Sequence, residues 1–500
     1  MSKIHVFPGP FILSLTMLTG LLLIPILGCL ILLPMNSDTA TGVERMKQLA
    51  LGVSLVTFVL SVVMWGEFDS SATQYQFVHE FNTLSFCHLN IGVDGISLYF
   101  VLLTTFITPL CILASWSNIT FGMKYYLIAF LLMESILIAV FVVLDLILFY
   151  IFYEAVLVPM FLVIGIWGGS VTRVRASLLL FLYTLAGSLF MLLAIVVIYY
   201  NVGTTDFTVV SLSNLSGGSQ KLLWLAFFLA FAVKTPLVPF HMWLPRAHAE
   251  APIGGSMLLA SLLLKLATYG YLRILVGMMP DASSYFSPLV QTIAIITLIY
   301  SSLATLRQVD FKALVAYSSI SHMAIVVLGI FSNTIIGIEG AIALSVAHGL
   351  VSPAMFVLVG SVLYDRFHTR VIRYYRGMTV YMPVFSLLFF LTSLANMAVP
   401  LSLNWVGELM SLAGTLQRSP VIGLLGASSI VLSACYTIFL FNRISFGAYS
   451  QYLSYTTDVT RREFMLLLPM IVGAFVLGIM PNIILDDLHV GVTQLLYTFE

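Results

Sequence analysis

The sequence Phe231-Ala-Val-Lys234-Thr-Pro236-Leu-Val-Pro239-Phe-His241 ends a long apolar segment and combines two prolines with a lysine. Each proline removes a backbone hydrogen bond and therefore interrupts a helix. Backbone groups freed at membrane depth are tolerated only where protein or a water-filled cavity satisfies them. The stretch therefore predicts a membrane-spanning helix that is broken beside a buried amine.

The composition of the whole chain supports a membrane protein. Apolar residues make up 60% of the 500 positions and charged residues only 8%, whereas a soluble protein carries about 25% charged residues. The formal net charge is zero, the only basic cluster is 366–376, and the four cysteines show no C-x-x-C spacing. This argues against nucleic-acid binding and against an iron–sulfur or zinc site. We expect an all-α polytopic membrane protein.

Hydropathy and its interruptions predict fourteen membrane-spanning helices. The predicted spans are 11–35, 47–66, 94–116, 125–144, 146–167, 175–200, 221–243, 253–278, 286–305, 311–331, 335–363, 381–413, 420–446 and 463–483. Fifteen basic residues, Lys312 among them, are assigned to loops after odd-numbered spans, and four, Arg273 among them, to the opposite side. Because basic residues accumulate in cytoplasmic or matrix loops, both termini should face the opposite, outer side.

A second interrupted span indicates an internal repeat. Asn396 and Pro400 interrupt the span 381–413, and Glu408 follows two turns later. Interrupted spans at matching positions of two halves are typical of inverted repeats in transporters. Spans four to eight should match spans nine to thirteen, with opposite topology because five is odd. The predicted units are N-terminal helices (1–121), a first repeat (122–279), a second repeat (280–447) and a C-terminal helix with its tail (448–500).

Several titratable side chains fall inside predicted spans, where a charge costs about 2.5–3.5 kcal/mol on insertion scales. They are Glu134, Glu154, Lys234, Lys265, His322, His348 and Glu408. Burial brings the pKa of an amine or a carboxyl group toward neutrality, where histidine already titrates. Such a row with water between its members predicts a proton relay. The alternative is that Glu–Lys pairs only hold helices together.

Two further local predictions concern the second half. Ser318 lies four residues before His322, so its hydroxyl could orient the imidazole on one helix face. Ser352 and Pro353 follow His348, which predicts either a third break in the span 335–363 or only a kink at Pro353.

The segment His241-Met-Trp-Leu-Pro-Arg-Ala-His248-Ala-Glu250-Ala-Pro252 resembles the signature of the antiporter-like subunits of NADH:quinone oxidoreductase, respiratory complex I. Similar matches occur at 262–270, 316–323, 347–350 and 404–408, so the resemblance covers about residues 92–485. Asp94-Gly-Ile-Ser-Leu, Tyr150 to Glu154 and a glutamate at 408 favour one branch of this family. One departure is Pro400-Leu401-Ser402, where the family usually has Pro-Gly-Thr.

The resemblance implies a role for each candidate. Glu154 would tune the key amine Lys234, Lys265 would pass protons toward the centre, and Glu408 would be the terminal group. His322 and His348 would lie on the central hydrophilic axis, and Glu134 and His241 are further candidates. The chain would bind no cofactor, since NADH, FMN, iron–sulfur clusters and ubiquinone belong to other subunits. The predicted function is proton translocation coupled to NADH oxidation and quinone reduction elsewhere in the complex.

The implied partners are other membrane and peripheral subunits of complex I, neighbouring antiporter-like subunits, and membrane lipids. The implied location is the mitochondrial inner membrane, with both termini in the intermembrane space; a bacterial plasma membrane is the alternative. The main alternative function is a subunit of a multi-subunit cation/proton antiporter, which shares Lys234 and the segment from His241 to Pro252. A purely structural membrane subunit is the third possibility.

Overall fold

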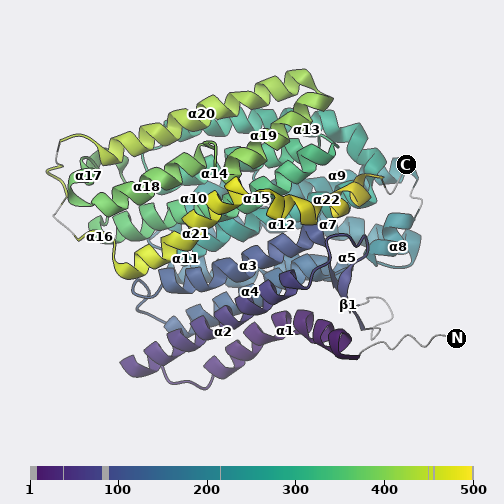
Figure 1. Cartoon of the computed structure of the whole chain (residues 1–500), viewed down its shortest axis with the longest axis horizontal. Coiled ribbons are helices and arrows are strands. Elements are labelled where there is room, and N and C mark those ends of the chain that lie inside the picture. The colour runs from purple at the N-terminus through teal and green to yellow at the C-terminus, as the bar shows by residue number, and fades with distance from the viewer. Residues whose placement is uncertain are drawn as a thin grey trace.

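The computed structural model describes residues 8–37, 39–81, 89–213, 216–448, 450–453 and 457–497. Its helices run between two ends of an elongated bundle, with α16 and α17 at one end and β1 and α8 at the other (Figure 1). We call these the α16 end and the α8 end. Among the described residues, eleven helical segments are long and apolar enough to cross a membrane. The predicted all-α membrane fold is confirmed.

The N-terminal part contains three helices and a hairpin. They are α1 (Pro8–Leu32), α2 (Ala40–Gly66), β1 (Gln76–Phe81), β2 (Leu89–Val93) and α3 (Gly95–Ala114). The antiparallel pair β1 and β2 lies between the predicted spans 47–66 and 94–116. The side chain of Asp94 accepts a hydrogen bond from the Ser97 amide and so caps α3.

The first repeat follows in the predicted order. Its segments are α4 (Met123–Val142), α5 (Leu146–Ala155), α6 (Leu157–Trp167), α7 (Arg173–Val202), α8 (Phe207–Leu212), α9 (Gly217–Lys234), α10 (Trp243–Glu250), α11 (Ile253–Leu258), η1 (Leu259–Leu263), α12 (Leu264–Gly270) and η2 (Tyr271–Val276). The segments η1 and η2 are π-helices on either side of α12. Such wide turns are rare and occur frequently at functional sites.

The second repeat and the C-terminal helices complete the bundle. They are α13 (Pro280–Leu306), α14 (Phe311–Ile330), α15 (Ile335–Phe356), η3 (Val357–Tyr364), α16 (Asp365–Phe367), η4 (Ile372–Tyr374), α17 (Met378–Tyr381), α18 (Pro383–Asn396), α19 (Leu403–Arg418), α20 (Pro420–Ser445), α21 (Arg461–Ile479) and α22 (Asn482–Tyr497). Each of the fourteen predicted spans corresponds to one helix or to a run of consecutive helical segments, whereas α22 was not predicted. The predicted break at Pro353 is wrong, because α15 continues through it to Phe356 and then widens into the π-helix η3.

Within the first repeat, two backbone hydrogen bonds connect the start of α5 to a later segment of the chain. We call this connection a latch. Asp145 caps α5 with its carboxylate, as the amides of Ile147 and Leu148 donate to it. The amide of Leu146 donates to the carbonyl of Thr205 (2.9 Å), and the amide of Phe207 donates to Leu144 (3.0 Å). This two-bond bridge ties the start of α5 to the segment that leads into α8.

The second repeat has the same latch at the start of α14. Asp310 caps that helix, the amide of Phe311 donates to the carbonyl of Arg370 (3.1 Å), and the amide of Ile372 donates to Val309 (3.0 Å). Every latch position differs from its counterpart in the first repeat by 165 residues. Because the first latch lies at the α8 end and the second at the α16 end (Figure 1), the repeats run in opposite directions.

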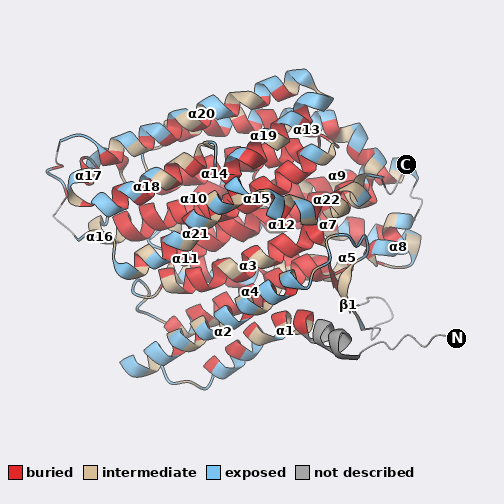
Figure 2. Cartoon of the chain, in the orientation of Figure 1, coloured by how far each residue is buried: buried red, intermediate tan, exposed pale blue. Residues whose placement is uncertain are grey.

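Burial separates a central helix from peripheral ones. Figure 2 shows mostly buried (red) ribbon at the centre of the bundle, around α12 and α15, and many exposed (pale blue) positions along α2 and α20. In the most apolar window of the run from Ile335 to Phe367 every residue is buried, compared with 28% in α2. The centre of the bundle therefore lies around α15, where several of the predicted titratable residues are found.

Candidate functional site

The break in the first repeat lies where the two prolines predict it. α9 ends at Lys234, and α10 begins at Trp243. The indole of Trp243 donates to the carbonyl of Val233 (2.9 Å), and the amide of Val238 donates to the hydroxyl of Thr297 (3.0 Å). Side chains thus satisfy backbone groups that the interruption frees, as a break at membrane depth requires.

Lys234 is buried at this break and contacts the helix that carries Glu154. Its Nζ donates to the carbonyl of Tyr153 (2.9 Å) and lies 3.4 Å from the centre of the Tyr153 ring. Glu154 is half-buried, and its Oε1 has no hydrogen-bond partner in the described part of the chain. The two charges act on each other electrostatically, but no ion pair between them occurs among the described residues. The expected pair is therefore close but separated in this structure.

Lys265 lies on α12 between the two π-helices and is fully buried. Its Nζ donates to the carbonyl of Ala260 in η1 (2.6 Å) and lies 2.7 Å from Nδ1 of His348. His348 belongs to the central helix α15, so this contact joins the two repeats. The sequence predicted both residues but not their direct contact.

From His348 the row continues to α14 and α19. The rings of His348 and His322 lie 5.8 Å apart, and Nδ1 of His322 is 2.8 Å from Oε1 of Glu408. All three side chains are buried. The prediction that Ser318 orients His322 is wrong, because the Ser318 hydroxyl donates to the carbonyl of Val315 and Glu408 holds the imidazole. Lys265, His348, His322 and Glu408 thus form one buried row.

The second break, between α18 and α19, contains a tight turn. The amide of Ser402 donates to the carbonyl of Val399 (3.1 Å), and Leu401 has a φ of +81°. Proline followed by a residue with positive φ is the pattern of a type II turn, and glycine is preferred at that second position. This explains why the family usually has glycine where this chain has leucine. Leu401 is 61% exposed, so its side chain fits at the cost of backbone strain.

Small residues allow α15 and α19 to approach closely. A Cβ atom added at Gly407 would lie 2.6 Å from the Cα of Leu344, and one added at Gly414 would lie 2.5 Å from the Cα of Gly337. Small residues at such spacings let membrane helices bring their backbones together. Glu408 follows Gly407 directly, so this close approach positions the carboxylate.

Two other predicted residues are not brought into the row. Glu134 is buried on α4 and accepts a hydrogen bond from the hydroxyl of Thr57 on α2 (2.5 Å). His241 is buried beside the rings of Tyr300 (5.3 Å) and Tyr317 (6.4 Å), and neither ring nitrogen has a hydrogen-bond partner among the described residues. In the described part of the chain, neither Glu134 nor His241 forms a hydrogen bond with a member of the row from Lys265 to Glu408.

Sequence reasoning misplaced two basic residues. Lys312 was assigned to a loop, but it lies in the first turn of α14 and is 3% exposed. Arg273 was counted among the loop residues of the outer side, but it lies inside the helical segment η2 and forms an ion pair with Asp94. The side of the membrane assigned to it stays a prediction. His248, which was quoted only as part of a motif, is fully buried on α10 and stacks on Phe356 at 4.5 Å. The proximity of Lys312 to a helix cap concealed its burial.

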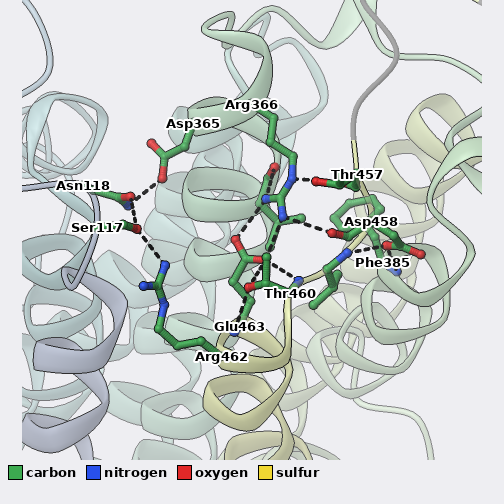
Figure 3. A network of polar contacts seen from close by, with 12 residues as sticks. Ser117, Asn118, Asp365, Arg366, Phe385, Thr457, Asp458, Thr460, Arg462 and Glu463 are labelled. Atoms are coloured by element: carbon green, nitrogen blue, oxygen red, sulfur yellow. Dashed lines mark hydrogen bonds and ion pairs between the residues drawn. The ribbon is translucent and has the colours of Figure 1, made fainter.

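At the α16 end, Arg366 fastens several segments together. It donates two hydrogen bonds to the carboxylate of Glu463 (2.9 and 2.8 Å) and others to the carbonyls of Thr457 and Asp458 (Figure 3). Nearby, the amide of Asn118 donates to Asp365 (2.6 Å). Burial raises the pKa of Asp310, the cap of α14 at the same end, and the Arg370 charge only partly opposes this rise. This end is therefore held by charged groups rather than by apolar packing alone.

Comparison with known proteins gives a consistent result. A family described as NADH:quinone oxidoreductase/Mrp antiporter, TM matches residues 143–433. NADH-ubiquinone oxidoreductase chain 4 of Mycosarcoma maydis is 68% identical over 482 residues, covering 96% of this chain and 100% of the relative. Chain 4 of Marchantia polymorpha is 45% identical, with 96% of both chains covered.

Two solved structures share the fold. A chain of respiratory complex I from Thermus thermophilus with bound NADH matches with a TM-score of 0.86 and 28% identity, over 96% of this chain and 99% of that one. A chain of the Mrp complex from Dietzia sp. DQ12-45-1b matches with a TM-score of 0.85 and 18% identity, over 97% and 98%. The predicted resemblance is confirmed, and the branch it favoured is chain 4. The chain belongs to the NADH-ubiquinone oxidoreductase chain 4 family.

Proposed function

We propose that this chain moves protons across the membrane as a membrane-arm subunit of complex I. The observation that carries the proposal is the buried row of Lys265, His348, His322 and Glu408, in which each member lies beside the next. Titratable groups inside a membrane are expensive and mark proton relays by default. A purely structural role would favour closed Glu–Lys ion pairs, and none occurs between these residues in the described part of the chain.

Lys234 and Glu154 form the adjustable part of the proposed relay. When Glu154 lies against Lys234, the amine keeps its proton; when the pair separates, the ammonium loses support and its proton moves toward Lys265. The hydroxyls of Tyr153 and Thr268 are buried and have no hydrogen-bond partner among the described residues. Buried polar groups of this kind bind ordered water, which we place between Lys234 and Lys265.

In this proposal electron transfer takes place in other subunits, which hold NADH, FMN, iron–sulfur clusters and ubiquinone. The described residues contain no cluster of three or more His, Cys, Asp or Glu side chains that could hold a metal ion.

The neighbours are other subunits of complex I, including antiporter-like ones, and lipids that cover the exposed apolar faces of α2 and α20. The location is the mitochondrial inner membrane, with the α8 end and both termini in the intermembrane space. The proposed structural units are the N-terminal helices (1–121), the first repeat (122–279), the second repeat (280–447) and the C-terminal helix with its tail (448–500).

The alternative is a cation/proton antiporter subunit. The likeness to the Mrp chain is at 18% identity and concerns the fold alone. Copurification separates the two functions: flavin and iron–sulfur partners support complex I, whereas sodium-dependent exchange without them supports the antiporter.

The test is Lys234→Ala in the assembled complex, measured as NADH-driven proton uptake in sealed vesicles. Pumping should be lost while assembly persists, because the relay depends on the proton that the Lys234 amine holds and releases. Lys221→Ala is the matched control, since Lys221 lies on the same helix but contacts the Tyr285 ring near the α8 end. A Lys234→Ala complex that pumps at the normal ratio would refute the relay.

A further inference from the structure

Lys312 is a buried amine that the relay described above does not use. It is 3% exposed, and its Nζ donates to the carbonyl of Ala251 (3.0 Å). Its stem passes beside η3, where a Cβ atom added at Gly360 would lie 3.2 Å from Lys312 Cε. It forms no ion pair with a carboxylate in the described part of the chain. An amine buried without such a partner is the kind of group that releases a proton readily.

His248 is a buried imidazole within electrostatic reach of both Lys312 and the relay residue Lys265. It is fully buried, its ring is stacked flat on Phe356, and the charges of both Lys312 and Lys265 act on it electrostatically. Neither ring nitrogen has a hydrogen-bond partner among the described residues, so one can accept a proton while the other donates. The Ser256 hydroxyl lies within hydrogen-bond distance of the carbonyls of His248 (3.3 Å) and Ala251 (3.4 Å). The Ser256 hydroxyl therefore connects the backbone of His248 to the carbonyl that accepts from Lys312.

On its other side Lys312 faces the α16 end. The carboxylates that act on it are Asp365, Asp310 and Glu250, and Arg370 is the nearby cation. Arg370 lies 3.4 Å from Glu250, and Asn118 holds Asp365 at the edge of the network in Figure 3. Asp365 and Glu250 are only half-buried, so water at this end can reach them.

We infer that Lys312 is a further proton-carrying residue, which takes protons at the α16 end and passes them through His248 to Lys265. In each step the ammonium of Lys312 gives its proton to one nitrogen of His248, and the other nitrogen gives a proton to the Lys265 amine. Lys312 is then reprotonated from the carboxylates and water at the α16 end. This inference rests on the proposed function, because it makes Lys265 the acceptor.

A merely structural role makes a different prediction. If Lys312 only supplies a positive charge and a hydrogen bond to Ala251, arginine can replace it, since arginine keeps both but does not release its proton. If Lys312 carries protons, arginine cannot replace it. Lys312→Arg therefore separates the two roles.

The experiment measures NADH-driven proton uptake by intact complex I in sealed vesicles for Lys312→Arg and His248→Phe. Both should lose at least about 100-fold in rate, the lower end of what a positioned proton-transfer group contributes, and the double variant should be no slower than either. Lys124→Arg is the matched control, because Lys124 also donates to a carbonyl, that of Met35, but lies outside the cluster. Wild-type pumping by Lys312→Arg would overturn the inference.

Two further variants keep the outcome decisive. If Lys312→Arg does not assemble, Lys312→His should pump faster than Lys312→Gln, because histidine can carry a proton; equal rates would overturn the inference. Lys265→Ala is measured in parallel. If Lys265→Ala pumps normally, the proposed relay itself is refuted. If Lys265→Ala does not pump but Lys312→Arg pumps normally, only the proposed role of Lys312 is refuted.

Discussion

Replacing Gly407 with alanine should slow proton transfer strongly without preventing assembly. The added Cβ would lie 2.6 Å from the Cα and the backbone nitrogen of Leu344. Since carbon atoms in contact are about 3.5–4.0 Å apart, α19 must move about 1 Å away from α15. Backbone atoms of a central buried helix cannot yield as a flexible side chain would, so the displacement falls on α19.

This displacement acts directly on the relay. Glu408 follows Gly407 on α19, and its Oε1 lies 2.8 Å from Nδ1 of His322 on α14. A shift of about 1 Å takes this pair beyond hydrogen-bond range, and a misplacement of that size can reduce a positioned reaction about 100-fold. Overpacking costs about 1–3 kcal/mol, which is less than the total stability of about 5–15 kcal/mol for a typical protein. The variant should therefore fold and pump poorly.

The assay is NADH-driven proton uptake by complex I in sealed vesicles, with assembly checked by native gel electrophoresis. Gly52→Ala is the control, because nothing lies within 4 Å of a Cβ atom added on that exposed face of α2. It should assemble and pump as the wild type does. A Gly407→Ala complex that assembles and pumps at the wild-type rate would show that the close approach of α15 and α19 does not position Glu408.

Three other changes test separate features. Leu401→Gly should raise the free energy of unfolding by about 1 kcal/mol, read as a higher melting temperature; no rise would contradict a strained turn. Arg366→Lys should lower the melting temperature, because lysine cannot make both bonds to Glu463; an unchanged temperature would exclude a structural role for the pair. Burial raises the pKa of Asp94, but the charge and hydrogen bonds of Arg273 outweigh burial and leave it below its usual value. Asp94→Asn should therefore lower the melting temperature at pH 7, and the difference from the wild type should shrink progressively as the pH falls below about 4; a difference that stays constant as the pH falls would contradict this.

The sequence predicted the spans and both broken helices because apolar length and proline act locally. Pro236 and Pro239 interrupt a helix whatever surrounds them. Partners could not be predicted in this way, since they depend on which helices meet. The contact between Lys265 and His348 joins residues 83 positions apart, and no local pattern indicates that their two helices meet at these positions.

Other features were hidden for physical reasons. Lys312 follows the cap residue Asp310, where a lysine usually points to solvent, and only the packing of α10 and η3 buries it. The helix α22 buries only a narrow stripe of Ile484, Leu488 and Val492, so it lacks the apolar length of a span. The π-helices η1, η2 and η3 differ from α-helices by one residue in hydrogen-bond spacing, which apolar length does not reveal.

The two latches also bear on how the chain reaches its folded state during synthesis. In each repeat the bridged residues, Asp145 with Asp206 and Asp310 with Val371, are 61 positions apart. Each latch can therefore close within its own half, before or without the other half. The contact between Lys265 and His348, by contrast, lies at the interface between the two halves, which we call the seam. Proton transfer would then begin only once two separately inserted units have docked, and two fragments divided between η2 and α13 should be able to rebuild the seam when they are produced together.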